Sequence, residues 1–368
     1  MSAAAPNSCR LVRETTARVA AAATRCTIDA DAVQKVVGGM TRETVHNMLG
    51  PREFDADGSL HFCDPADPDL TTRYLLAVDA INFCFWPDHD AIRPPGLELR
   101  GGTVGSSDMK DGTLATQGLE YEHVAGGLKR AVERDRGVLD ADRLALIDGP
   151  ALRALLGWPR PLPLEEERAR LIREVGAGLA ANFGGSAVAL VQAAGGHAPT
   201  LVDLVMRTFP GFRDAVIDPR DGRQVYLCKR AQIFVGDVWG CFQGAGLGNF
   251  GASIGELTMF ADYRVPVVLR GMGIMRYDSA LAAMVDSSTL IAAGSAEELE
   301  IRACTVQAVE QMKSSLRARL AREPELAAGV DTGGPGVTSV AIDWFLWNEG
   351  EAMRDQSPPH HRTLTVFY

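Results

Sequence analysis

The sequence contains few cysteines, no long apolar run and no excess of basic residues. Its seven cysteines among 368 residues are scattered and form no Cys-x-x-Cys pair, which excludes a disulfide framework and a thiolate zinc site. This usage is typical of reduced thiols in an intracellular protein, and we expect a cytoplasmic location. No apolar run reaches the roughly 18 residues that a membrane-spanning helix needs, so no membrane partner is expected. Four cysteines stand in apolar or helical settings and are predicted to be small core residues: Cys84, Cys228, Cys241 and Cys304.

Basic charge is also scarce. The chain carries 47 acidic against 37 basic side chains, a formal net charge of -10. Nucleic-acid-binding proteins usually present a basic face. The balance therefore argues against duplex DNA or an anionic membrane as a partner, but it leaves room for a local basic pocket that holds one phosphate.

Standard nucleotide and hydrolase signatures are absent as well. The sequence has no P-loop, no Gly-x-Gly-x-x-Gly after a strand and no Gly-x-Ser-x-Gly. The glycines of GAGLGNFG, 244–251, resemble a phosphate loop. No strand precedes them and no Gly-Lys-Ser/Thr follows, so they are interpreted as a turn between helices.

The apolar spacing predicts a mainly α protein with small β elements. Helices are expected at residues 10–25, 31–48, 71–84, 119–134, 164–183, 199–208, 229–242, 295–321 and 339–350, with short helices near 140–155. A hairpin is expected at 221–227, a strand at 363–368, and loops at 88–118 and 331–336. No strong linker interrupts the chain, which favours a single compact unit over residues 1–368. Loops near 88–118 and 157–163 can divide it into two helical lobes, about 1–160 and 161–368.

The segment KRAQIFVGDVWGCF, 229–242, places an acid on a helix that is apolar nearly all round and is therefore predicted to be buried. A buried carboxylate is costly unless it is paired or used. Asp237 can serve a purely structural purpose by pairing with Lys229 or a nearby backbone N–H, or it can be a catalytic group.

A second acid stands in the apolar segment FADYRVP, 260–266. Pro266 fits the first position of a helix, which places Asp262, Tyr263 and Arg264 on the turn that leads into it. Such a turn exposes side chains next to the positive end of the helix dipole. The alternative is a buried Asp–Arg pair that only fixes the turn. Two such carboxyls suit the cleavage of a glycosidic bond, in which one stabilises the cationic sugar and the other activates water or assists the leaving group.

Aromatic and basic groups complete the candidate site. The runs NFCFW, 82–86, and DWFLW, 343–347, each carry three aromatic rings, which either stack on a nucleobase or pack in the core. The segment PPHHRT, 358–363, brings two histidines and an arginine together, and such groups can hold a phosphate. A metal site is the rival interpretation, but adjacent histidines rarely reach one ion and no carboxylate stands at helical spacing from them.

Five segments in order resemble the queuosine salvage proteins, which are queuosine 5′-phosphate N-glycosylases/hydrolases. The segments are NFCFW, KRAQIFVGDVW, LTMFADYRVP, GSAEELEIRACTVQAVE and PPHHRTLTVFY. The resemblance extends from about residue 12 to the C-terminus and is weak over 88–160. It implies a mainly helical fold related to helix-hairpin-helix DNA glycosylases.

The resemblance also implies an N-glycosidase that releases queuine from queuosine 5′-monophosphate for insertion into tRNA, with no metal or organic cofactor and no stable nucleic-acid complex. Asp237 and Asp262 would be the catalytic acids. The substrate-binding residues it implies are Phe83, Trp86, Lys229, Tyr263, Arg264, Trp347, His361 and Arg362. Glu300 and Arg302 are expected in a helix–helix ion pair that supports the site. The alternatives are a helix-hairpin-helix nucleic-acid glycosylase or binder, and a non-catalytic queuine-binding protein.

Overall fold

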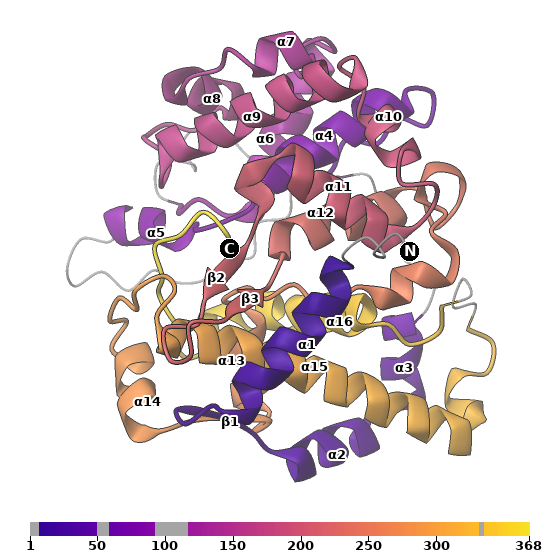
Figure 1. Ribbon diagram of the computed structural model, residues 1–368, viewed down its shortest axis with the longest axis vertical. Helices are drawn as coiled ribbons and strands as arrows, with labels where there is room; N and C mark the ends of the chain where they lie inside the picture. The colour runs from indigo at the N-terminus through magenta and orange to yellow at the C-terminus, as the bar shows by residue number, and fades with distance from the viewer. Residues whose placement is uncertain (1–6, 50–58, 93–116, 331–334) are drawn as a thin grey trace. The chain divides into compact units, whose positions relative to one another are not determined.

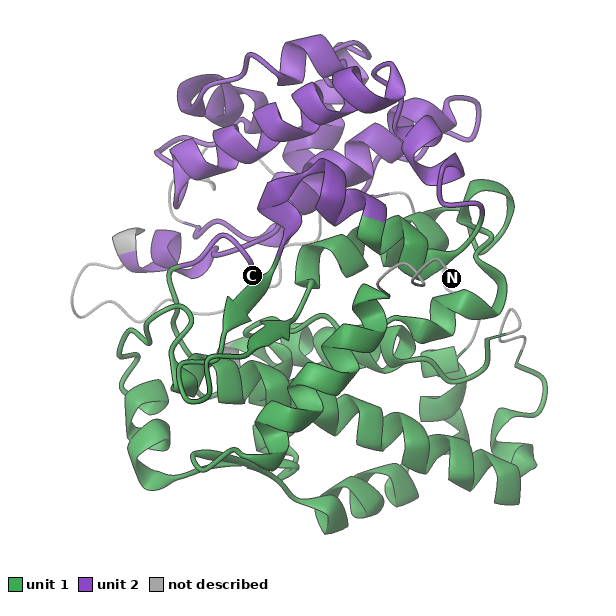
Figure 2. Cartoon of the chain, viewed as in Figure 1, with its two compact units in different colours: residues 1–52, 196–203, 214–364 green, residues 53–195, 204–213, 365–368 purple. Residues whose placement is uncertain are grey.

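The computed structural model describes residues 7–49, 59–92, 117–330 and 335–368, and over these residues the protein is mainly helical with two small antiparallel sheets (Figure 1). The expected mainly α fold with small β elements is therefore confirmed. The chain divides into two units, coloured separately in Figure 2. Unit 1 comprises Met1–Arg52, Gly196–Asp203 and Asp214–Leu364, and unit 2 comprises Glu53–Gly195, Leu204–Arg213 and Thr365–Tyr368. The single salvage unit with two lobes remains a prediction.

Unit 1 is built around the long helix α15, which packs against α1, α2, α13 and α16. Its helices are α1 (Ser8–Ala21), α2 (Ala30–Gly39), α3 (Arg42–Leu49), α12 (Lys229–Cys241), α13 (Val265–Gly271), α14 (Ser279–Asp286), α15 (Ala296–Arg322) and α16 (Ser339–Ala352). Its strands are β1 (Cys26–Ile28) paired with β4 (Met275–Tyr277), and β2 (Ala215–Ile217) paired with β3 (Gln224–Tyr226). The 3₁₀ turns are η2 (Gly246–Gly248), η3 (Gly251–Glu256), η4 (Pro324–Ala327) and η5 (Arg354–Gln356).

Unit 2 is a bundle in which α9 packs against α4, α7, α8 and α10. Its helices are α4 (Pro68–Ala80), α5 (Trp86–Ile92), α6 (Tyr121–Arg134), α7 (Ala141–Leu144), α8 (Gly149–Leu156), α9 (Glu165–Phe183) and α10 (Ala187–Gln192), followed by η1 (Pro210–Phe212). The helix α11 (Ala198–Thr208) runs from one unit into the other.

Local signals explain many of these boundaries. The Asp29 side chain accepts the N–H of Ala32 and begins α2. The Ser295 side chain accepts the N–H of Glu298 at 3.3 Å and begins α15. Gly184 ends α9 in the left-handed conformation, with φ at 60°. The four cysteines that were predicted to be core residues are buried.

Several predicted elements differ from the structure. The helix expected at 31–48 is two helices, because Met40 is extended and Thr41 accepts the N–H of Thr44 as a new cap. The helix expected at 71–84 begins at Pro68, behind the cap Asp67, and ends at Ala80. Pro87 lies in the first turn of the next helix, α5.

The other corrections concern the predicted loops and the C-terminal strand. The expected strand at 363–368 is irregular, and the neighbouring residue Arg362 forms only an isolated bridge with Leu290. In the expected loop at 88–118, residues 88–92 are helical and residues 93–116 lie outside the described residues. In the expected loop at 331–336, residues 331–334 also lie outside them. No helix in the described part of the chain is long and apolar enough to cross a membrane.

Candidate active site

The buried helix α12 carries the first candidate acid and a lysine on one side. Asp237 and Lys229 are 6% and 4% exposed and lie eight residues apart, about two helical turns. Burial raises the pKa of Asp237 from 3.8 to about 7, and the positive charge of Lys229 opposes that rise. The prediction that this helix is buried is confirmed, and Asp237 is a carboxyl poised to titrate near neutral pH.

The second acid lies on the turn before α13, as the proline predicted. Pro266 occupies the first turn of α13, and the Asp262 Oδ1 atom accepts the N–H groups of Arg264 and Val265, each at 3.0 Å. The carboxyl is half-buried, and burial raises its pKa while Lys229 lowers it. The Lys229 ammonium therefore acts on both candidate acids, which places all three groups in one electrostatic cluster within unit 1.

The alternative interpretation was that Arg264 pairs with Asp262 only to fix the turn, and the structure does not show this pair. The Nε atom of Arg264 lies 2.7 Å from Oε1 of Glu351 on α16, and Glu351 also pairs with Arg354. The turn is fixed instead by the backbone N–H groups that Asp262 accepts. Only one oxygen of the Asp262 carboxyl is committed to this turn.

The segment 257–261, which leads to Asp262, belongs to no helix or strand and is held by side chains. Thr258 N–H donates to Gln232 Oε1 on α12 at 2.8 Å, and Phe260 N–H donates to Asp343 Oδ1 on α16 at 3.0 Å. Arg302 Nε on α15 donates to the Ala261 carbonyl at 3.0 Å. Three helices of unit 1 thus fix the backbone that carries Asp262.

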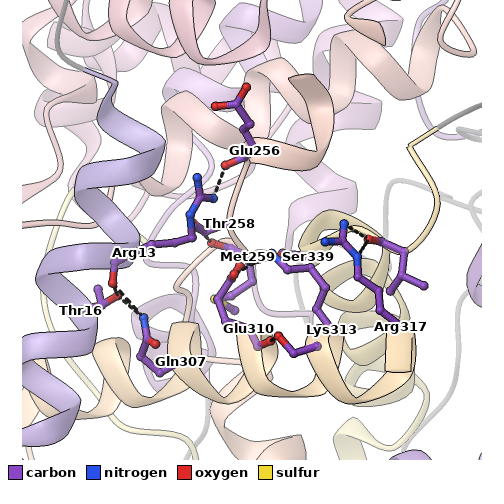
Figure 3. A network of polar contacts seen from close by, with 12 residues as sticks. Arg13, Thr16, Glu256, Thr258, Met259, Gln307, Glu310, Lys313, Arg317 and Ser339 are labelled. Atoms are coloured by element: carbon purple, nitrogen blue, oxygen red, sulfur yellow. Dashed lines mark hydrogen bonds and ion pairs between the residues drawn. The ribbon is translucent and has the colours of Figure 1, made fainter. Parts of the chain in front are cut away.

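A second polar network holds Glu256, the residue before this segment (Figure 3). Arg13 of α1 donates to the carbonyl of Glu256, and the Arg13 carbonyl accepts Gln307 Nε2 of α15 at 3.1 Å. Further along α15, Lys313 Nζ donates to Glu310 at 2.6 Å and to Ser339 Oγ of α16 at 2.8 Å. Burial lowers the pKa of Lys313 and Glu310 opposes this shift. These contacts tie α1, α15 and α16 together beneath the segment.

The C-terminal histidines meet the turn that carries Asp262. The Tyr263 and His360 rings stack with centroids 4.4 Å apart. His361 is 1% exposed, and burial, followed by the charges of His360 and Arg302, holds its pKa well below 6.5. The His361 imidazole is therefore neutral at pH 7 and offers hydrogen bonds instead of charge. Arg362 is half-buried, and its carbonyl accepts the N–H of Ile291 at 2.8 Å.

Aromatic rings from α16 also lie near α12. Trp344 stacks on Trp239 with centroids 5.8 Å apart. A Cβ on Gly236, the neighbour of Asp237, would lie 3.0 Å from the Phe260 ring and 3.7 Å from Trp344. The glycine thus lets α12 approach these rings closely. Trp347 is half-buried on the same helix α16.

The predicted base-binding residues Phe83 and Trp86 belong to unit 2. Phe83 is 1% exposed, and the Arg168 guanidinium lies 4.3 Å from its ring centroid. Arg168 also donates from Nη2 to the Cys84 carbonyl at 3.1 Å and from Nε to the Pro163 carbonyl at 2.7 Å. Trp86 is half-buried at the start of α5. A role for these two rings at the acid pair stays a prediction.

Glu300 and Arg302 do not pair with each other, contrary to the expectation. Arg302 pairs with Asp214, with Nη2 to Oδ2 at 2.6 Å, whereas Glu300 pairs with Arg220 at 2.7 Å. Among the residues that the structure describes, no group of three His, Cys, Asp or Glu side chains could hold a metal ion.

Sequence reasoning missed three polar residues that build the site. Gln232, Asp214 and Asp343 are buried, and their partners are backbone groups or charges distant in the sequence. Arg302 was assigned to the wrong partner. For Gln232 and Asp343, the available signal was a polar residue in an otherwise apolar helix, since such a group must find a hydrogen bond when buried.

Comparison with known proteins gives a consistent result. The family model described as queuosine salvage protein matches residues 61–368. A protein of Dictyostelium discoideum is 38% identical over 98% of this chain and 100% of its own length, and one of Sphaerobacter thermophilus is 37% identical over 97% of both. A Mus musculus protein is 29% identical over 84% of this chain and 86% of its own. All three are named queuosine 5′-phosphate N-glycosylase/hydrolase. The chain, in which Lys229 acts on the buried Asp237 and the half-buried Asp262, belongs to the queuosine salvage protein family.

Proposed function

We propose that this protein is an N-glycosidase that hydrolyses queuosine 5′-monophosphate to queuine and ribose 5-phosphate, so that the base can be salvaged into tRNA. The family and the shared name of its relatives support the reaction. The structural observation that carries it is the cluster of Asp237, Asp262 and Lys229, in which two carboxyls share one cation.

The substrate sets an unusual demand on the acids. Queuine is a 7-deazaguanine, so the position of the purine N7 is a carbon and cannot be protonated to ease departure of the base. The bond between the ribose C1′ and the base nitrogen breaks with its electron pair going to the base. A water oxygen then bonds to C1′. One water proton ends on the base nitrogen, and the other stays on the new hydroxyl group at C1′.

The two acids differ in a way that suggests how they divide this work. Because burial raises its pKa to about 7, Asp237 is partly protonated near neutral pH, so it can donate a hydrogen bond or proton to the departing base. Asp262 is more exposed and is stabilised by two N–H groups at Oδ1. Its carboxylate can face the sugar cation and accept a proton from the attacking water.

The other predicted substrate-binding residues differ in the charge that they can offer to the ribose 5-phosphate part of the substrate. Arg264 shares its charge with Glu351, and His361 is neutral because its pKa is lowered. Arg362 is a candidate cation for the phosphate, with Tyr263 and His361 as hydrogen-bonding groups. Lys229 neutralises the acids. A grip on the phosphate provides binding energy that orients the glycosidic bond.

The finer assignments belong to the same proposal. We expect the helical fold to be related to helix-hairpin-helix DNA glycosylases, which superposition of an experimental structure on such enzymes would test. We also expect a cytoplasmic enzyme with no stable nucleic-acid complex. Salt-sensitive binding to tRNA or DNA would contradict that expectation.

The decisive experiment incubates the purified protein with queuosine 5′-monophosphate, queuosine, GMP and queuosine-containing tRNA in parallel, followed by chromatography of the released base. We expect queuine from the monophosphate alone. Release from the tRNA would favour a polymer glycosylase instead. Tight binding of queuine without turnover of any substrate would favour a binding protein.

A further inference from the structure

Arg302 of α15 contacts two separate segments of the candidate active site with one guanidinium. Its Nε atom donates to the carbonyl of Ala261, the residue before Asp262, at 3.0 Å. Its Nη1 and Nη2 atoms donate to Asp214 at 3.0 and 2.6 Å. Arg302 is 2% exposed, so it lies behind the site instead of at its surface.

Asp214 extends this contact to the helix that carries the other site residues. Its Oδ2 atom accepts the N–H of Lys229 at 3.1 Å, and its carbonyl accepts the N–H groups of Leu227 and Cys228, each at 2.9 Å. Cys228 precedes α12 with φ at 54° and provides no side-chain cap. The Asp214 carboxylate therefore takes the place of the missing cap and fixes the first residue of α12.

We propose that Arg302 is a positioning residue, which sets the Asp262 carboxyl relative to Lys229 and Asp237 by holding Ala261 and Asp214 in one rigid fork. This inference rests on the proposed function and adds a residue to it that does not touch the substrate. A planar guanidinium can hold a carboxylate with two N–H groups and a carbonyl with a third at the same time. Lysine offers a single nitrogen on a flexible stem, so it cannot reproduce this geometry.

The same helix offers a matched control. Glu300 lies two residues before Arg302 and is 1% exposed. Its Oε2 atom accepts the N–H groups of Thr24, Arg25 and Cys26, and its Oε1 atom accepts Arg220. Glu300 is thus a buried charged residue that, like Arg302, holds several backbone and side-chain groups, but none of the groups it holds belongs to a proposed site residue.

The test compares Arg302→Lys and Glu300→Gln with the wild type in the hydrolysis of queuosine 5′-monophosphate. Both variants are expected to lose stability. We expect Arg302→Lys to lower kcat at least 30-fold with KM changed less than threefold, and to shift the pH profile of kcat because the Lys229–Asp262 spacing changes. Glu300→Gln should keep kcat and the pH profile within twofold of the wild type. Circular dichroism at the assay temperature establishes that each variant is folded.

Asp214→Asn is the second variant, because it keeps the shape of the side chain and an oxygen that can accept the Lys229 N–H. It should lower kcat in the same direction as Arg302→Lys, and it decides the matter if Arg302→Lys does not fold. If Arg302→Lys or Asp214→Asn folds and keeps the wild-type kcat and pH profile, the positioning role of Arg302 is overturned, and the proposed function is not affected. An equal loss of kcat in Glu300→Gln would do the same, because it would make the effect a general loss of packing. A wild type that releases no base would overturn both the inference and the proposed function.

Discussion

Replacement of Asp237 by asparagine should stabilise the protein at alkaline pH while it removes activity. The pKa of this carboxyl is raised from 3.8 to about 7, because burial disfavours its charge. Between these two values the folded protein binds more protons than the unfolded chain. Stability therefore falls as pH rises from about 4 to about 7 and changes no further above that range.

The size of the effect follows from the two pKa values. A difference of one pKa unit corresponds to about 1.4 kcal/mol. Ionisation of Asp237 thus lowers the free energy of unfolding by about 4 kcal/mol at pH 8 and by about 1.5 kcal/mol at pH 5. Replacement by asparagine removes this destabilisation, but the buried polar amide itself costs about 1–2 kcal/mol of stability. We expect a net gain of about 2–3 kcal/mol at pH 8 and a gain near zero at pH 5.

The assay is urea unfolding of the wild type and Asp237→Asn at pH 5, 6, 7 and 8, followed by circular dichroism. Asp218→Asn is the control of opposite sign, because hydrogen bonds from Arg220 lower the pKa of Asp218. Its stabilising contribution is present above the ordinary carboxyl pKa and is lost as pH falls through the folded value. Asp218→Asn should therefore be less stable than the wild type at pH 8. If Asp237→Asn is also less stable at pH 8, or if its advantage does not grow between pH 5 and pH 8, Asp237 is not a buried carboxyl with a raised pKa.

Three further predictions can be checked with the same methods. Asp262→Asn should lower kcat by about 100- to 10,000-fold at unchanged circular dichroism, because the amide oxygen can still accept the N–H groups of the turn; activity near wild type would remove Asp262 from the mechanism. Lys229→Met should move the pH profile of kcat/KM to higher pH, because Lys229 lowers the pKa of both Asp237 and Asp262; an unmoved profile would contradict the shared cluster. Gly176→Ala should destabilise the protein to urea by about 1–3 kcal/mol, because a Cβ on this residue of α9 would collide with the backbone of Ala141 on α7. Unchanged stability would show that α9 and α7 can move apart without cost.

Local signals in the sequence predicted much of the fold. The cap Asp29, the cap Ser295 and the terminating glycine Gly184 act within a few residues of their own position, so no tertiary information is needed to place them. The pairing of β1 with β4 was not predicted. Each strand has only three residues, and their register joins Cys26 to Tyr277 across most of the chain.

The candidate site was predictable to a different degree. Asp237 and Asp262 could be selected because an acid in an apolar segment needs a reason to be there. The residues that hold them could not be paired, because the partners are distant: Gln232 and Thr258 are 26 residues apart, and Asp343 and Phe260 are 83 residues apart. A sequence shows that a buried polar group needs a partner but not which backbone group the fold will offer.

The contacts that hold Asp262 determine how sensitive the site is to substitutions elsewhere in the core. Segment 257–261 belongs to no helix or strand of the described structure, so side chains supply its hydrogen bonds. Those side chains come from α12, α15 and α16, and the position of the acid therefore depends on how the three helices pack. A sheet would fix such a segment through its own regular ladder. Here a core substitution that shifts α15 or α16 by a fraction of an ångström would move Asp262 without touching it, and activity would fall before the fold does.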